Sequence, residues 1–199
     1  DMKFDANADD FTIGVIGAGA MGQGIAQVSL QGGMQVLLFD ANKEGASAGR
    51  DLIFQRLDRS VDKGRLALDA VSQMKNNLIL ADSIAAFKSC NVVVEAVFED
   101  LKVKHAVYEE LEQHVSSECI IASNTSSLPI SSLGRSCERQ ERFAGLHFFN
   151  PVPLMRLVEV IRGPSTDDWV IDGLVKLGER MGRTPVVVRD APGFLVNTG

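Results

Sequence analysis

Two ionisable residues, His147 and Glu159, each stand inside an apolar segment, and a turn containing two prolines separates the segments. The first segment is RFAGLHFF and the second is LMRLVEVI. If both are strands, alternate residues share a face, so each ionisable side chain lies among apolar neighbours. Burying an unpaired carboxylate costs on the order of several kcal/mol, which makes His147 the obvious partner of Glu159.

A carboxylate beside an imidazole fixes which ring nitrogen is free and thereby orients the ring. Such a histidine can accept a proton near neutral pH, which is the chemistry of a general base. The alternative is a His–Glu hydrogen bond in the core without chemistry. These two residues alone do not decide between the two interpretations.

Further polar side chains follow a predicted strand at 119–123, in the loop SNTSS. Ligands of open α/β sheets bind beyond the carboxyl ends of strands, where Asn124 and Ser126 could hydrogen-bond a substrate oxygen. A helix cap or a turn is an equally common use of such a loop. Asn150 follows the histidine strand and could equally be a turn residue before Pro151.

A second site is indicated by the stretch GAGAMG, residues 17–22, which fits the pattern G-x-G-x-x-G. A strand precedes it, a helix follows it, and Asp40 ends the next strand, which is the context of a dinucleotide-binding loop. The helix N-terminus would attract the pyrophosphate, and Asp40 would bind ribose hydroxyls and repel a 2′-phosphate, which favours NAD over NADP. The expected cofactor contacts are Gly17, Gly19, Ala20, Met21, Gly22 and Asp40, with Asn124 beyond the strand at 119–123.

These residues need a scaffold in which strands and helices alternate. Strands are expected at 11–17, 35–40, 77–82, 91–97, 119–123, 142–149, 154–161 and 185–190, with helices after the glycine loop and at 42–64, 68–75, 101–115 and 166–181. This alternation predicts an α/β protein with a doubly wound, mostly parallel sheet of the Rossmann type. We expect a disordered leader at 1–10, one NAD-binding domain at 11–190 and the start of a further helical part at 191–199.

Composition excludes several classes of protein. The 199 residues are 45% hydrophobic and carry a net charge of −6, which suits a globular domain and argues against nucleic acid as the main partner. No apolar run approaches the length of a membrane span. The three cysteines show no C-x-x-C spacing, so they predict reduced thiols in the cytoplasm and no metal site.

Five segments together resemble a known family. They are IGVIGAGAMGQGIAQV, VVVEAVFEDLKVK, ASNTSSLPI, GLHFFNPVPLMRLVEVI and DAPGFLVN, in that order. Their combination closely resembles the L-3-hydroxyacyl-CoA dehydrogenase family over about residues 11–197. The string HFFNPVPLMRLVEV is highly specific, whereas the glycine loop is not.

The resemblance implies roles for individual residues. His147 resembles the catalytic base of the family and Glu159 its acidic partner. Ser126 and Asn197 resemble the groups that hold the C3 oxygen or the thioester end of the substrate, and Asn150 resembles a further active-site amide.

Three more residues take a role only from the resemblance. Glu99 and Lys104 match positions that contact NAD, and Lys63 matches a lysine near the CoA nucleotide. From the residues alone, Glu99 and Lys104 are typical of a helix start with an acid in its first turn and a surface lysine. Lys63 would belong to a solvated helix face with its neighbours Arg56, Arg59 and Arg65.

The implied activity is oxidation of the 3-hydroxyl of a 3-hydroxyacyl-CoA to the ketone in fatty acid β-oxidation, with hydride transfer to NAD. Alternatives are a dehydrogenase of a hydroxy acid or sugar acid without CoA, as in the λ-crystallin/gulonate dehydrogenase branch, or a non-enzymatic NAD-binding protein. Family members usually continue with a helical domain that completes the cleft and forms a homodimer. We therefore expect this chain to bind NAD and to turn over little by itself.

Overall fold

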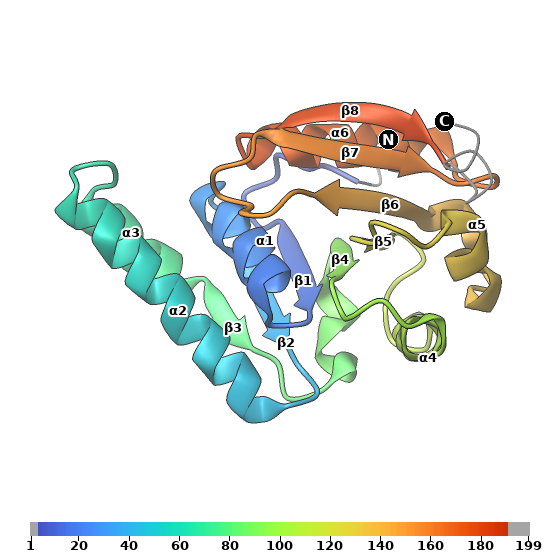
Figure 1. The fold of residues 1–199 in the computed structure, drawn as a ribbon, viewed down its shortest axis with the longest axis horizontal. Coiled ribbons are helices and arrows are strands. Elements are labelled where there is room, and N and C mark those ends of the chain that lie inside the picture. The colour runs from blue at the N-terminus through green and yellow to red at the C-terminus, as the bar shows by residue number, and fades with distance from the viewer. Residues whose placement is uncertain (1–3, 191–199) are drawn as a thin grey trace.

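An eight-stranded sheet runs through the protein in the order β3-β2-β1-β4-β5-β6-β7-β8 (Figure 1). The structure, a computed structural model, describes residues 4–190. Strands β7 and β8 run antiparallel to the other six, and β7 meets β6 in the antiparallel pair. The strands are β1 (Thr12–Ile16), β2 (Gln35–Phe39), β3 (Leu78–Leu80), β4 (Val92–Glu95), β5 (Ile120–Ser123), β6 (Phe143–Phe148), β7 (Leu157–Arg162) and β8 (Thr184–Arg189).

Helices cover both faces of this sheet. Helices α1 (Ala20–Gln31) and α6 (Asp168–Arg180) pack on one face, and α2 (Lys43–Asp62) and α3 (Leu68–Asn76) lie side by side beyond α1 (Figure 1). The opposite face carries α4 (Leu101–Glu112), α5 (Ile130–Leu133) and the 3-10 turn η1 (Ile84–Ser89). Two further 3-10 turns, η2 (Gly134–Ser136) and η3 (Gln140–Arg142), lead into β6. The predicted doubly wound, mostly parallel Rossmann-type sheet is confirmed.

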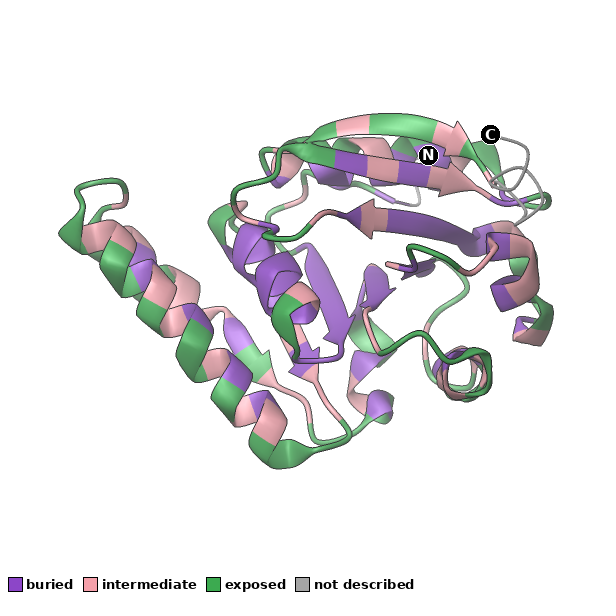
Figure 2. Cartoon of the chain, in the orientation of Figure 1, coloured by how far each residue is buried: buried purple, intermediate pink, exposed green. Residues whose placement is uncertain are grey.

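The central strands form because they are apolar on both faces. Val92, Val93 and Val94 of β4 are each 0% exposed, as expected for a parallel strand covered by helices on both sides. Figure 2 shows this burial in β1 and β4, while the outer faces of α2 and α3 are exposed. Strand order reverses between β1 and β4, and ligands of such sheets bind in the crevice at that reversal.

The expected disordered leader at 1–10 is wrong for residues 4–10. Phe4 is buried and packs edge-to-face on Phe11, with 5.3 Å between ring centroids. The Arg180 guanidinium donates to the carbonyl oxygens of Ala6 and Ala8 at 2.8 Å each. The acidic composition of residues 1–10 gave no sign that Phe4 is buried. It also gave no sign that Arg180, more than 170 residues away in the chain, binds this segment.

Local sequence patterns predicted most helix and strand boundaries to within a few residues of the observed ones. The predicted N-cap Asn42 accepts hydrogen bonds from the backbone N–H groups of Glu44 and Gly45. The four-residue α5 was not predicted, since it is too short to show a helical period. The further helical part expected to start at 191–199 lies outside the described residues. No helix in residues 4–190 combines the length and the apolar character that a bilayer crossing needs.

Candidate active site

The glycine loop between β1 and α1 needs glycine at two positions. Gly17 has a φ of 108°, and a Cβ there would lie 2.6 Å from the carbonyl oxygen of Ala96. A Cβ on Gly22 would lie 1.7 Å from the carbonyl oxygen of Gly17. A side chain at position 17 would therefore collide with the segment after β4, and one at position 22 would push α1 away from the loop. A Cβ on Gly19 would meet no atom within 4 Å, so this part of the loop is open to an approaching ligand.

The start of α1 and the end of β2 meet at this loop. The N-cap of α1 is Gly19, which has no side chain to bond the first backbone N–H groups. Such a helix start binds anions. Asp40 accepts a 2.8 Å hydrogen bond from Ala18 N, so its carboxylate is fixed beside the loop. Ala20 is exposed and Met21 is half-buried. These residues fit a dinucleotide, with its pyrophosphate at the helix start and a ribose at Asp40.

His147 and Glu159 are brought together by strand register. They are direct partners in the antiparallel pair of β6 and β7, and His147 Nδ1 lies 3.0 Å from Glu159 Oε1. The bond at Nδ1 leaves Nε2 available to a ligand. The Phe149 ring packs on the imidazole, with 4.4 Å between centroids.

The expectation that this pair is shielded from water is only half met. The side chain of His147 is 17% exposed, but that of Glu159 is 32% exposed. Leu157, which starts β7 and shares the face of Glu159, is itself 38% exposed. The imidazole is therefore oriented by a carboxylate that solvent still reaches.

The loop after β5, residues 124–128, is called the site loop here. Its first residue, Asn124, accepts a 2.7 Å hydrogen bond from the backbone N–H of Phe148, the residue after His147. This bond ties the end of β5 to the end of the histidine strand. Ser126 is exposed, and within residues 4–190 its hydroxyl has no hydrogen-bond partner, while its backbone N–H donates to Glu99.

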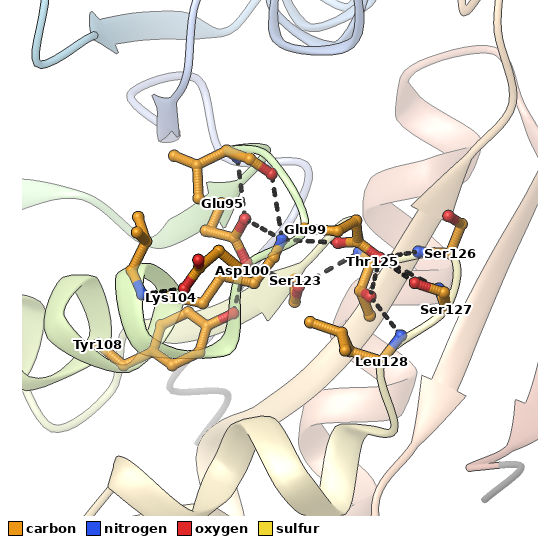
Figure 3. A network of polar contacts seen from close by, with 12 residues as sticks. Glu95, Glu99, Asp100, Lys104, Tyr108, Ser123, Thr125, Ser126, Ser127 and Leu128 are labelled. Carbon is orange, nitrogen blue, oxygen red and sulfur yellow. Dashed lines mark hydrogen bonds and ion pairs between the residues drawn. The ribbon is translucent and has the colours of Figure 1, made fainter. Parts of the chain in front are cut away.

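Glu99 joins the site loop to helix α4, as Figure 3 shows. Its Oε2 accepts hydrogen bonds from the Thr125 hydroxyl at 2.8 Å and the Ser127 hydroxyl at 2.7 Å. Its Oε1 lies 3.0 Å from Lys104 Nζ. Burial alone would raise the pKa of Glu99, but the hydrogen bonds from Ser127, Thr125 and Lys104 and the lysine charge outweigh it and lower the pKa to about 2.

Lys104 is not the surface lysine that the helix pattern indicated. Its side chain is 1% exposed, and its ammonium contacts Glu95 Oε2 at 2.5 Å, Glu99 Oε1 at 3.0 Å and the Val97 carbonyl oxygen at 3.2 Å. Three partners occupy the three donors of an ammonium. Glu99 itself precedes the helix, because Asp100 is the N-cap of α4. The expected NAD contacts of Glu99 and Lys104 stay predictions.

Asn150 and Lys63 lie in a different place from the histidine pair, in a pocket of about 460 Å³. This basic pocket is also lined by Arg56, Arg59 and Arg65, so the four cations share one concavity and not only a solvated helix face. Arg56 donates to Gln23 Oε1, and Gln23 Nε2 donates to the Ala18 carbonyl oxygen. The pocket is thereby connected to the glycine loop.

Sequence reasoning missed three residues behind the site loop, namely Glu95, Tyr108 and Ser123. The signal for Glu95 was present, because this acid interrupts an apolar run, as Glu159 does. Tyr108 stands four residues after Lys104 on the same face of α4, and both point at the end of β4 (Figure 3). Asn197, expected to hold the substrate, lies outside the described residues.

Comparisons with known proteins agree with this geometry. The family described as 3-hydroxyacyl-CoA dehydrogenase, NAD binding domain, matches residues 12–191. The chain is 44% identical over 98% of its length to a fatty acid oxidation complex subunit alpha of Pseudomonas paraeruginosa, of which it covers 27%. It is 42% identical over 92% of its length to a probable 3-hydroxybutyryl-CoA dehydrogenase of Deinococcus radiodurans, of which it covers 66%.

A solved structure shows the same fold. The 3-hydroxybutyryl-CoA dehydrogenase of Escherichia coli superposes with a TM-score of 0.90 at 38% identity, over 96% of this chain and 40% of that one. The chain thus spans between about a quarter and two thirds of the length of these relatives. On the match over residues 12–191, the chain belongs to the 3-hydroxyacyl-CoA dehydrogenase family and contains its NAD-binding domain.

Proposed function

We propose that the protein oxidises the 3-hydroxyl of a 3-hydroxyacyl-CoA to the 3-ketoacyl-CoA. The observation that carries this proposal is the bond between His147 Nδ1 and Glu159 Oε1, which leaves Nε2 as a free proton acceptor. The names of the relatives, which include dehydrogenases of 3-hydroxybutyryl-CoA and a fatty acid oxidation subunit, support this substrate class and a place in fatty acid oxidation.

Each site residue of this chain has its own role in the proposed reaction. His147 Nε2 takes the proton of the substrate hydroxyl, and the Glu159 carboxylate stabilises the imidazolium that forms. The exposed Ser126 hydroxyl orients the reacting oxygen, while the bond from Phe148 N to Asn124 holds the site loop against the histidine strand. NAD, when bound, supplies the acceptor for the C3 hydride. Asn197 and Asn150 would orient the thioester part of the substrate.

The basic pocket favours a CoA ester over a free acid. Coenzyme A carries several phosphate charges, and Lys63 with three arginines lines a concavity large enough for part of a nucleotide. A small hydroxy acid or sugar acid would leave these cations unused. Asn150 lines the same pocket three residues after His147, so one ligand could extend from the cations toward the base.

The test is a single-turnover assay with the protein in excess over NADH. Acetoacetyl-CoA is expected to oxidise NADH, whereas equal concentrations of free acetoacetate are not. Oxidation by both at similar rates would support the dehydrogenase of a free acid. No oxidation with either substrate, at protein concentrations where NADH is shown to bind, would contradict the proposed activity and support a non-enzymatic NAD-binding role.

We also infer a cytoplasmic location and a homodimer. Cys90, Cys119 and Cys137 are buried and unpaired, and burial raises the pKa of Cys119 and Cys137 to about 12, which supports thiols that stay reduced and unreactive. The dimer rests on the resemblance, in which a helical domain that follows this one makes the contact. Cell fractionation tests the location, and sedimentation of this chain against a chain that includes such a domain tests the dimer.

A further inference from the structure

Glu95 is a buried carboxylate that the proposed reaction does not use. It stands at the carboxyl end of β4 and is 0% exposed. Its Oε2 accepts from Lys104 Nζ at 2.5 Å and from Val97 N at 2.9 Å, and its Oε1 accepts from Ser123 Oγ at 2.7 Å and from the Tyr108 hydroxyl. Four donors satisfy this buried charge, an arrangement that stays stable only while all partners are in place.

Two routes lead from Glu95 to the site loop. Along the sheet, the Ser123 hydroxyl that donates to Glu95 accepts a 3.2 Å hydrogen bond from Thr125 N. Along the helix, Lys104 bridges Glu95 to Glu99, whose Oε2 accepts from the backbone N–H groups of Ser126 and Ser127 (Figure 3). Both routes end on the loop that carries Ser126.

Every backbone N–H from Thr125 to Leu128 donates to a side chain of this network. Thr125 donates to Ser123, Ser126 and Ser127 donate to Glu99, and Leu128 donates to the Thr125 hydroxyl. The loop is therefore held by side chains and not by a strand or helix of its own. Burial and the neighbouring Glu95 charge raise the pKa of Tyr108 well above its usual value, so its hydroxyl stays a donor to Glu95.

We propose that Glu95 is a positioning residue that fixes the site loop, through Lys104 with Glu99 and through Ser123, in the place where Ser126 faces substrate. Glu95 touches no reacting atom, because it is fully buried behind the loop. The consequence for turnover rests on the proposed function, whereas the effect on the loop does not. A Gln side chain at position 95 keeps the shape but removes the charge that holds the ammonium.

Hydrogen exchange of the unliganded protein tests the loop directly. In Glu95→Gln, the amides of residues 125–128 are expected to exchange on the order of 10-fold faster, while the amides of β1 keep their wild-type rates, because the opening is local. The control is Glu109→Gln, an exposed acid on helix α4, which is expected to leave the loop unchanged. Unchanged loop rates in Glu95→Gln, or an equal rise throughout the protein, would overturn the proposal.

A second variant covers the case in which Glu95→Gln fails to fold. The double variant Glu95→Gln with Lys104→Met leaves no uncompensated buried ammonium and is expected to fold. Since both routes to the loop are weakened in it, residues 125–128 are still expected to exchange faster than in the wild type. A double variant with wild-type loop exchange would show that Glu95 and Lys104 serve the core alone.

Binding separates a positioning role from a general loss of structure. The site loop would hold the nicotinamide of NADH, whereas ADP-ribose lacks that group. Glu95→Gln is expected to weaken NADH binding several-fold and to keep ADP-ribose binding, and an equal loss for both ligands would contradict positioning. If the wild type oxidises no NADH, the proposed function fails, and the exchange rates of the loop still decide the role of Glu95.

Discussion

Glu159 of β7 lies directly opposite His147 of β6, with its Oε1 3.0 Å from the imidazole Nδ1. The register of two neighbouring strands sets this distance, so the pair is held by backbone hydrogen bonds and not by loop conformation. A site built on strands positions its groups more accurately than one built on loops. The proposed proton acceptor thus has a fixed position beside a loop whose position depends on side chains.

The Glu159→Gln variant should lose most turnover while keeping its fold. The amide cannot stabilise an imidazolium, and its NH2 group can donate to Nδ1 and so move the ring proton to Nε2. We expect the single-turnover rate constant to fall roughly 10²- to 10⁴-fold with little change in NADH affinity. Single-turnover kinetics and fluorescence titration measure the two quantities. A variant with the wild-type single-turnover rate constant would mean that Glu159 is only a structural partner.

The glycine loop gives a matched pair of substitutions. Gly22→Ala should destabilise the protein by roughly 3 kcal/mol or more, because its Cβ would overlap the carbonyl oxygen of Gly17. Gly19→Ala should cost less than about 1 kcal/mol, since its Cβ meets no protein atom. Gly19→Ala should nevertheless weaken NADH binding, because the added Cβ would occupy the open side of the glycine loop. Urea unfolding and NADH titration of both variants check this, and unchanged NADH affinity in Gly19→Ala would place the dinucleotide elsewhere.

Glu99 should make stability depend on pH in the acid range. Its pKa is about 2 in the folded protein against a usual value of 4.5, so its contribution is fully present above pH 4.5 and is lost as pH falls toward 2. The wild type should therefore be more stable than Glu99→Gln at pH 7, and the difference should shrink steadily below pH 4.5. Urea unfolding at several pH values tests this, with the exposed Glu110→Gln as control. A difference that stays constant down to pH 3 would show that the charge is not what holds the loop.

The basic pocket predicts a charge effect on substrate binding. In the double variant Lys63→Ala with Arg59→Ala, KM for acetoacetyl-CoA should rise about two- to fivefold for each cation removed, the range of exposed ion pairs. Lys88→Ala, which removes an exposed cation outside the pocket, should leave KM unchanged. The rise in KM of the double variant should be smaller at high salt. Equal KM values in all three proteins would exclude this pocket as the CoA site.

The sequence could predict the fold and the His147–Glu159 pair because both depend on local patterns. Strand alternation and a short turn are enough to place two residues opposite each other. The Glu95–Lys104 pair could not be predicted in this way, since its partners come from a strand and the following helix. The amphipathic pattern of that helix assigned Lys104 to the polar face, whereas the end of β4 buries it. The burial of Phe4 could not be predicted for the same reason, because its partner Trp169 comes from a distant part of the chain.

The His147→Gln variant decides whether His147 is the base of the proposed reaction. NADH oxidation by acetoacetyl-CoA is measured with protein in excess, so that a single turnover is visible even if the chain is slow. We expect a rate roughly 10²- to 10⁴-fold below wild type, with NADH affinity unchanged within about twofold and the free energy of unfolding in urea unchanged within about 1 kcal/mol. A His147→Gln protein that oxidises NADH at the wild-type rate would contradict the role of His147 as the base.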